Sequence, residues 1–283
     1  MAGGWYILNR SRPSDYNNPA KERSMDFQVN GKLAYISAGS TGIGEAIANL
    51  LTKEGAKVIV SARNPDTLKE KGGAWHGTVS ADIATAQGVQ KAVDYVLGSF
   101  GRAPDILINN LGVADATPFE QMTDERWEHS LNVNLMGNVR TLRALLPLMA
   151  KLEGSAVVNT GSDLAKQPEF TLTDYGSCKA ALLYLTKALS KQYAGRPRIN
   201  VISPGPVWTA MFSRPGGIID QVAAQYGVDR DTAKIRFLED RQMPMGMPDP
   251  EDVAYAAVFL ASPLAKFING ANIDIGGTLR GLI

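Results

Sequence analysis

The sequence predicts an α/β fold in which a doubly wound parallel sheet carries helices on both faces. Two observations support this prediction. Five short runs of the 283-residue chain are almost wholly apolar, and longer segments with apolar residues at helical spacing separate them. Strands that are apolar on both faces and alternate with helices are typical of a parallel sheet covered on both sides. Because no linker follows residue 28, a single domain accounts for the pattern.

The elements follow one another in a regular order. The predicted strands are residues 33–37, 57–61, 105–109, 156–160 and 199–203. The helices with the clearest period cover residues 44–55, 125–152 and 179–195. In the first of these, apolar residues recur at Ile47, Leu50 and Leu51, and Gly55 ends the helix.

The composition argues against several kinds of partner. Hydrophobic residues make up 45% of the chain, and the net charge of +1 gives no reason to expect a nucleic-acid or membrane partner. The single cysteine, Cys178, excludes an internal disulfide and suits a reducing compartment. No apolar run approaches the roughly 18 residues of a transmembrane helix, and the N-terminus lacks the apolar core of a signal peptide. We therefore expect a soluble, cytoplasmic protein.

The N-terminal residues differ from the rest of the chain. Residues 1–25 are polar, rich in turn-forming residues and aperiodic. We interpret them as an N-terminal extension or tag that is in part disordered. Residues 26–283 then form the folded domain.

A glycine-rich segment, SAGSTGIG at residues 37–44, lies between the first predicted strand and the first predicted helix. Gly42 and Gly44 would let the backbone approach a pyrophosphate and let helix and strand pack closely. The start of the helix supplies free N–H donors and partial positive charge for the phosphates. The alternative is an ordinary strand-to-helix turn. The position favours a dinucleotide site on a Rossmann-type sheet.

The end of the second predicted strand indicates which dinucleotide is bound. NAD sites usually place an acidic residue here to hold the ribose 2′-hydroxyl group, but this chain has Ala62 and then Arg63. A guanidinium matches a 2′-phosphate in charge and geometry, whereas an acid would repel it. NADP(H) is therefore favoured and NAD(H) remains possible. The alternative for Arg63 is a solvated cation at a strand end.

Tyr175 and Lys179 are four residues apart, a spacing that places both side chains on one face of a helix. Taken alone, the pair could be two unrelated surface residues. Further motifs accompany it, namely the 37–44 loop, INNLG at 108–112, VNL at 133–135, Ser162, YGSCK at 175–179 and SPGPVWT at 203–209. Together they resemble the short-chain dehydrogenase/reductase family, from about Asp26 to the C-terminus. Ser162 precedes Tyr175 by 175 − 162 = 13 residues, as in many members of that family.

The resemblance implies a set of site residues. The implied catalytic residues are Asn134, Ser162, Tyr175 and Lys179. The implied cofactor-binding residues are Ala38, Gly39, Ser40, Gly42, Ile43, Gly44, Arg63, Asp82, Ile83, Asn110, Gly112, Tyr175, Lys179, Pro204, Gly205, Val207 and Thr209. The chain departs from the family pattern at three points. Ala38 replaces the first glycine of the loop, Leu111 replaces an alanine, and the Gly276–Gly277 pair lacks its usual preceding aspartate.

These residue types suit proton transfer beside a hydride acceptor. An unperturbed tyrosine has a pKa of about 10, and lowering it by roughly 3 units requires about 4 kcal/mol. We expect the Lys179 cation, one turn away, to supply much of that stabilisation, with help from the helix dipole and from an oxidised nicotinamide. Tyr175 would then be the general acid/base, and Ser162 would hydrogen-bond the substrate oxygen. Asn134 would support a water relay to Lys179.

Other candidate residues have simpler interpretations. Cys178 is interpreted as a small packing residue and not as a nucleophile. His76 and His129 are far apart in the sequence and show no metal-ligand spacing, so no metal site is predicted. Asp163 and Lys166, beside Ser162, could add a polar contact to a substrate.

Residues 206–247 are the predicted substrate lid. Trp208, Met211 and Phe212 stand beside the Gly216–Gly217 pair, which indicates a mobile segment over an apolar ligand. The alternative is that the methionines of this segment only pack it onto the core.

The predicted function is hydride transfer between NADP(H) and an apolar carbonyl compound or secondary alcohol, as in a ketone reductase or an alcohol dehydrogenase. Two alternatives stay open: a non-redox enzyme that retains the cofactor, such as a dehydratase or epimerase, and a catalytically silent NADP-binding sensor. The resemblance also implies a homotetramer or homodimer. Its expected contact surfaces are residues 126–152 and 267–277.

Overall fold

The computed structural model describes residues 26–71 and 74–276. Its centre is a seven-stranded sheet in which every pair of neighbours is parallel, in the order β3-β2-β1-β4-β5-β6-β7. The strands are β1 Leu33–Ser37, β2 Lys57–Ala62, β3 Gly77–Ser80, β4 Ile106–Asn109, β5 Ala156–Thr160, β6 Arg198–Pro204 and β7 Asn272–Ile275. The predicted doubly wound α/β fold is confirmed. The extension or tag predicted for residues 1–25 lies outside the described residues.

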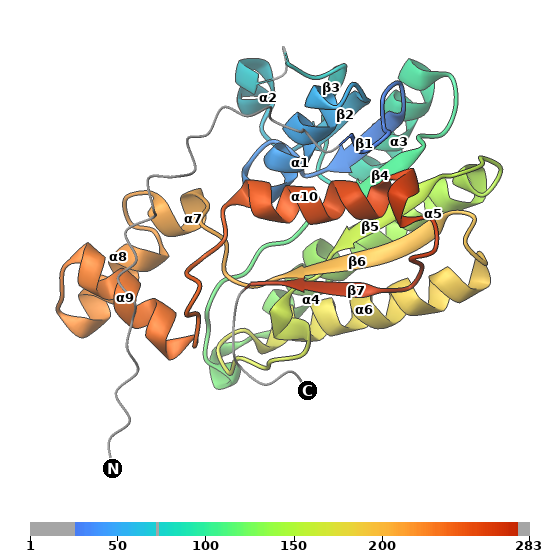
Figure 1. Cartoon of the computed structure of the whole chain (residues 1–283). Helices are drawn as coiled ribbons and strands as arrows, with labels where there is room; N and C mark the ends of the chain where they lie inside the picture. The colour runs from blue at the N-terminus through green and yellow to red at the C-terminus, as the bar shows by residue number, and fades with distance from the viewer. Residues whose placement is uncertain (1–25, 72–73, 277–283) are drawn as a thin grey trace, which may run out of the picture.

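Helices cover both faces of the sheet (Figure 1). They are α1 Gly42–Lys53, α2 Pro65–Lys71, α3 Ala86–Phe100, α4 Asp124–Leu131, α5 Gly137–Met149, α6 Thr173–Gln192, α7 Ala210–Ser213, α8 Ile218–Tyr226, α9 Arg230–Asp240 and α10 Pro250–Ala261. Helices α1 and α10 pack together and share one core cluster with the sheet. Helices α3 and α5, with apolar residues of α6, form the second cluster on the opposite face.

The strands belong to two cores because alternate side chains point to opposite faces. In β1, Ile36 packs in the cluster with α1 and α10, whereas Tyr35 packs in the other cluster. In β4, Ile108 and Leu107 divide in the same way. This double burial explains why the strands read as continuous apolar runs and not as alternating ones.

Two predicted helices differ from the observed ones. The predicted helix over 125–152 is divided by a π-helical turn, Asn132–Met136, that joins α4 to α5. The predicted helix over 179–195 begins earlier, at Thr173, so that Tyr175 lies in its first turn and Lys179 one turn later. Residues with weak apolar character fill this extra turn, and the apolar period alone therefore misplaced its start.

The order of the strands places a topological reversal point between the central strands β1 and β4. The chain runs from β1 outward to β3 and then crosses back to β4, on the other side of β1. In open parallel sheets such a reversal point, at the carboxyl ends of the strands, is where ligands bind. Helices α7, α8 and α9 follow β6 and lie beyond the carboxyl ends of the strands, around a small apolar cluster of their own (Figure 1).

Candidate active site

Three of the predicted catalytic residues meet at the carboxyl end of β5. Ser162 follows this strand and caps a short helical turn, where its Oγ accepts a hydrogen bond of 3.2 Å from the Leu164 N–H. The Tyr175 side chain hydrogen-bonds to that of Ser162. Lys179 Nζ lies 5.5 Å from the centroid of the Tyr175 ring. The strand therefore supplies the serine, and α6 supplies the tyrosine and lysine on one face.

Lys179 is held from below by the sheet. Only 1% of its surface is exposed, and its Nζ donates hydrogen bonds to the Thr160 carbonyl at 2.8 Å and the Leu111 carbonyl at 3.3 Å. Burial lowers the pKa of Lys179 to about 8, because the charged form loses its hydration. The ammonium group is thus fixed to backbone carbonyls beneath the tyrosine.

The pKa of Tyr175 runs opposite to the sequence-based expectation. Burial raises the pKa of Tyr175 to about 12, against a hydrogen bond with Ser162 that lowers it. The carboxylate of Asp163 and the thiol of Cys178 raise it further. The expected lowering by Lys179 is therefore wrong for the chain by itself, because desolvation is the largest cause of the shift and Lys179 is not among its causes. A lowered pKa requires positive charge from a bound group.

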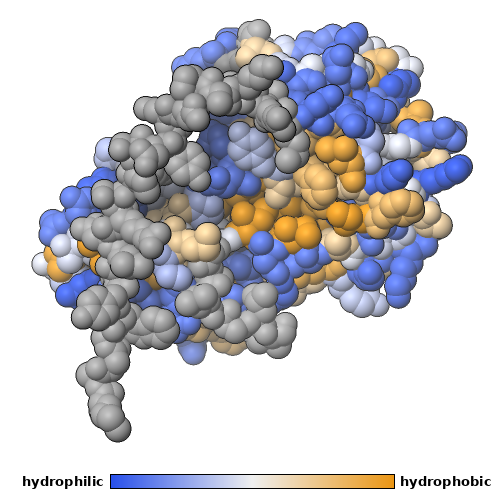
Figure 2. All heavy atoms as spheres, viewed as in Figure 1, coloured by the Kyte–Doolittle hydropathy of each residue, from blue (hydrophilic) through white to orange (hydrophobic). Residues whose placement is uncertain are grey.

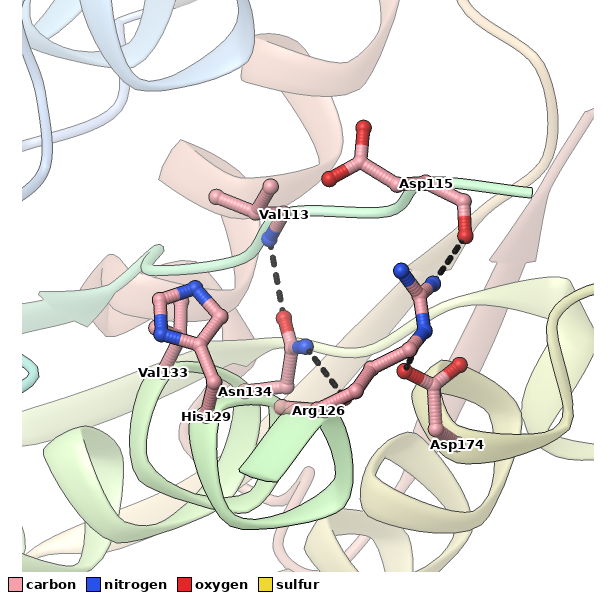
Figure 3. Close-up of a pocket in the computed structure, with 8 residues that line it drawn as sticks. Val113, Asp115, Arg126, His129, Val133, Asn134 and Asp174 are labelled. Atoms are coloured by element: carbon pink, nitrogen blue, oxygen red, sulfur yellow. Dashed lines mark hydrogen bonds and ion pairs between the residues drawn. The ribbon is translucent and has the colours of Figure 1, made fainter. Parts of the chain in front are cut away.

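Asn134 lies in the π-helical turn and is 2% exposed. Its Oδ1 accepts a hydrogen bond of 2.8 Å from the Val113 N–H, and its Nδ2 donates to Ser130 Oγ at 3.1 Å (Figure 3). A Cβ atom on Gly112 would lie 3.0 Å from Lys179 Nζ and 3.6 Å from Asn134 Oδ1. The side chain of Asn134 thus anchors the loop segment that passes next to Lys179.

A cavity of about 30 Å³ lies beside Asn134, which is room for one or two water molecules (Figure 3). Its lining residues are Val113, Asp115, Arg126, His129, Ser130, Val133, Asn134 and Asp174. Arg126 and Asp174 form an ion pair across it, with 3.4 Å between Nε and Oδ2, and Arg126 also bonds the Asp115 carbonyl. The sequence analysis missed this pair, because nothing in the sequence indicates that two charges on separate helices will meet.

The glycine-rich loop keeps its tight turn despite Ala38. This residue has a φ of 51°, in the left-handed region that glycine usually occupies. The next residue, Gly39, has no room for a side chain, since a Cβ there would lie 2.7 Å from Ile36 Cγ2. A Cβ on Gly44 would lie 2.5 Å from Asn110 Nδ2. The alanine therefore accepts backbone strain, and the glycines allow the close packing of helix and strand.

Side-chain hydrogen bonds join this loop to the neighbouring strands. Asn110 Nδ2 donates to the Ala38 carbonyl at 3.1 Å, and Thr160 Oγ1 donates to Asn110 Oδ1, also at 3.1 Å. In the segment after β6, Thr209 Cγ2 would lie 3.3 Å from a Cβ on Gly42. The segment that begins at Gly205 thus faces the phosphate loop.

The predicted cofactor residues do not all offer their side chains. The side chains of Ile83 and Val207 are 2% and 4% exposed and pack in the core, so any cofactor contact falls to their backbone. Pro204 is buried at the end of β6, and Ser40 is 8% exposed. The partly exposed residues of the set are Ala38, Gly42, Ile43, Asn110, Tyr175, Gly205 and Thr209.

The adenosine end of the predicted site is open. Arg63, Asp82 and Gly112 are exposed. Arg63 directly follows β2. The Gly39 N–H donates a hydrogen bond of 3.1 Å to the Ser61 carbonyl in that strand, so β2 lies next to the phosphate loop. Helix α1 begins at Gly42 without a side-chain cap from Thr41, so its first N–H groups stay available to phosphates. These features fit a dinucleotide.

Two other kinds of feature were sought in residues 26–71 and 74–276. No helix in these ranges is long and apolar enough to cross a membrane. The same ranges hold no group of three or more His, Cys, Asp or Glu side chains that could bind a metal ion.

Comparison with known proteins gives consistent similarities. Residues 37–278 match a family model described as enoyl-(acyl carrier protein) reductase. The chain is 33% identical over 268 residues to a D-threitol dehydrogenase of Mycolicibacterium smegmatis, an alignment covering 91% of this chain and 97% of the relative. An L-sorbose reductase of Gluconobacter frateurii, solved with NADPH and L-sorbose, has 31% identity and a TM-score of 0.84 over 91% of this chain and 100% of that one. A 3-ketoacyl-(acyl-carrier-protein) reductase of Brucella melitensis, solved with NADH, has 28% identity and a TM-score of 0.74 over 88% and 98% of the two chains.

Proposed function

The chain belongs to the short-chain dehydrogenase/reductase family, whose members here are oxidoreductases that act on alcohol or carbonyl groups, and we propose that it interconverts a ketone and a secondary alcohol with a nicotinamide cofactor. One observation carries the proposal: Ser162 and Tyr175 are hydrogen-bonded to each other, and Nζ of the buried Lys179 lies 5.5 Å from the centroid of the tyrosine ring. A proton donor, an oxygen-binding hydroxyl group and a fixed cation are then within one cluster.

In this mechanism the chain's own residues bind the substrate oxygen and move its proton. The hydroxyl group of Ser162 holds the carbonyl oxygen, and Tyr175 donates a proton to that oxygen as negative charge develops there. In the reverse direction the phenolate of Tyr175 removes the alcohol proton. A bound nicotinamide dinucleotide would supply or accept the hydride. Lys179 would hold its ribose, and Asn134, with the adjoining cavity, would support a water relay.

We further propose that the cofactor is NADP(H). The support is the exposed guanidinium of Arg63 at the end of β2, which would pair with a 2′-phosphate. Replacing Arg63 by Ala should reduce the preference for NADPH over NADH by about 10-fold or more, since a charge-assisted contact is lost. Ratios of kcat/KM with the two cofactors measure this. An unchanged ratio would assign Arg63 to the solvated surface.

The substrate proposal is a small ketone or the matching alcohol. Trp208, Phe237 and Met247 belong to the apolar cluster of the predicted lid, which supports a partly apolar binding surface. The decisive experiment is a panel of ketones and secondary alcohols assayed with NADPH and NADH side by side. Cofactor consumption that matches alcohol formation is expected. A cofactor that binds without being consumed would favour the non-redox alternative or the sensor.

The segment 206–247 is proposed to act as the lid over this substrate. Side-chain contacts occur within this segment and between it and the rest of the chain. Lys234 Nζ lies 4.2 Å from the centroid of a Trp208 ring, within the segment, and Arg241 forms an ion pair of 3.1 Å with Glu169, before α6. Contacts of this kind hold a closed position without burying a large apolar area.

Assembly into a homotetramer or homodimer is likewise proposed. Figure 2 shows apolar side chains gathered over α10 and the adjoining edge of the sheet. The exposed apolar residues of this part of the chain are Tyr255, Leu264, Phe267 and Ile273, of which Phe267 is 92% exposed. Edge strand β7 lies beside them. A single monomeric species by light scattering at micromolar concentration would contradict this assembly. We also propose that the protein is located in the cytoplasm.

A further inference from the structure

A second ionisable side chain lies against the catalytic serine. Asp163 directly follows Ser162 and is 9% exposed. Ser162 Oγ donates a hydrogen bond of 3.1 Å to Asp163 Oδ1. The other carboxylate oxygen, Oδ2, would lie 3.4 Å from a Cβ on Gly205, which begins the segment facing the phosphate loop. One carboxylate oxygen therefore faces the serine and the other faces Gly205.

The serine hydroxyl group has a single proton, and the Asp163 carboxylate and a substrate carbonyl oxygen compete for it. An ionised carboxylate only accepts hydrogen bonds, so Ser162 is the donor toward Asp163. Its oxygen meanwhile accepts from the Leu164 N–H. The neutral Tyr175 hydroxyl group, which hydrogen-bonds to Ser162, is then the donor to the serine oxygen. In this arrangement the serine has no proton left to give to a substrate carbonyl oxygen.

When the serine turns to the carbonyl group, the Asp163 carboxylate gives up the hydrogen bond from Ser162. Removing one donor from a buried carboxylate is unfavourable by an amount that corresponds to about a 10- to 100-fold loss in kcat/KM. A hydroxyl group on the carbon next to the carbonyl avoids this loss. Vicinal oxygens are about one hydrogen-bond length apart, similar to the separation of Ser162 Oγ and Asp163 Oδ1. One substrate oxygen can then bind the serine while its neighbour donates to the aspartate.

We propose that Asp163 is a specificity-determining residue that accepts a hydrogen bond from a hydroxyl group adjacent to the reacting carbon, so that the substrates are α-hydroxy ketones and the corresponding vicinal diols. The inference rests on the proposed carbonyl reduction. Lys166, on the same turn, does not replace this role, because its Nζ is bonded to the carboxylate of Asp274.

The test compares two substrates that differ by one hydroxyl group, 2-hydroxycyclohexanone and cyclohexanone, with NADPH and with NADH. The wild-type enzyme should show a kcat/KM about 10- to 100-fold higher for the hydroxylated ketone. Asp163→Ala should remove most of this difference, chiefly through a lower value for the hydroxylated ketone. A purely structural effect would lower both values alike, so their ratio separates the two roles.

Two further variants keep the test decisive. Asp163→Asn preserves the size of the side chain and replaces the alanine variant if that variant does not fold. It should also reduce the ratio of the two kcat/KM values, because a neutral amide oxygen accepts a hydrogen bond less strongly than a carboxylate. Asp274→Asn is the matched control, a carboxylate of the same region that is bonded to Lys166, and it should leave the ratio unchanged. An unchanged ratio in both Asp163 variants would overturn the inference while the reductase proposal stands. Absence of turnover with every ketone and alcohol would instead overturn the reductase proposal.

Discussion

Two regions of the proposed site are built in different ways. The floor consists of the phosphate loop, residues 37–44, together with Ser162, Tyr175 and Lys179, and the roof consists of α7 to α9. On the floor, Ser162 and Lys179 are 5% and 1% exposed, and both are bonded to the backbone near β5. In the roof, α7 to α9, Met211 is 45% exposed, and the local apolar cluster is small. The floor shares its packing with the sheet, whereas the roof shares little. The proposed proton-transfer groups are therefore fixed by the fold, and the proposed substrate surface can change without disturbing them.

The largest expected effect lies on the floor. Tyr175→Phe removes the proton donor and leaves the ring, so kcat should fall about a thousandfold or more. The dissociation constant of the cofactor should change by less than about threefold, because the phosphate loop and Arg63 are untouched. Stopped-flow turnover and fluorescence titration measure the two quantities. Substantial turnover by the variant would remove the distinction between a catalytic floor and a binding roof.

The pH dependence should also be a property of the floor. Burial raises the pKa of Tyr175 to about 12; Asp163 and Cys178 add to the rise, and Ser162 opposes it. The nearby cation is Lys179, whose own pKa is lowered to about 8 by burial. Alcohol oxidation needs the phenolate, so kcat/KM for oxidation should keep rising with pH above neutrality. Ketone reduction needs the protonated phenol and should stay constant across the same range.

Removing the carboxylate at position 163 sharpens that prediction. Asp163 raises the pKa of Tyr175, so Asp163→Asn should lower that pKa and move the oxidation profile to lower pH. A roof substitution should leave the position of the profile unchanged. The profiles are measured as kcat/KM for one secondary alcohol at saturating cofactor. A profile that moves to higher pH, or does not move, would contradict the assigned electrostatics.

A smaller effect is expected in the roof. Phe212 and Phe237 pack edge to face there, with 5.4 Å between ring centroids. Phe237→Ala should raise KM by roughly 3- to 10-fold with kcat nearly unchanged, because it loosens a substrate surface and not the proton donor. Leu145→Ala, in the core beneath the sheet, should instead lower the free energy of unfolding by about 2–5 kcal/mol. Equal losses of stability in both variants would mean that the roof is part of the main core.

The same contrast explains what could be predicted from the sequence. The strands β1 and β5 have the predicted bounds, since a strand buried on both faces leaves a continuous apolar run. Strands β3 and β7 were missed because they are four-residue edge strands with partly exposed side chains. Spacing predicted that Tyr175 lies close to Lys179 and Ser162, because one partner is on the same helix and the other is a fixed number of residues away.

Other features of the site depend on tertiary contacts that leave no pattern in the sequence. The approach of Arg126 to Asp174 joins α4 to α6, and neither residue belongs to a motif. The direction in which the pKa of Tyr175 shifts depends on how much water the fold removes from around the hydroxyl group. The spacing of residues in the sequence does not encode that quantity. Likewise, whether Ser162 has a proton to donate to a substrate depends on its hydrogen bond to Asp163. Only the structure shows that bond.

The smallest expected effect concerns strain in the floor itself. Ala38 occupies the left-handed region with a φ of 51°, so Ala38→Gly should stabilise the protein by about 1 kcal/mol, reduced by the loss of a small apolar contact. Gly154, with a φ of 69° and no atom within 4 Å of a Cβ, is the matched control. Gly154→Ala should destabilise by a similar amount through the backbone alone. Thermal unfolding measures both changes. A lower midpoint for Ala38→Gly would mean that the alanine methyl group contributes more by packing than its backbone strain costs, and that the floor is rigid without being strained.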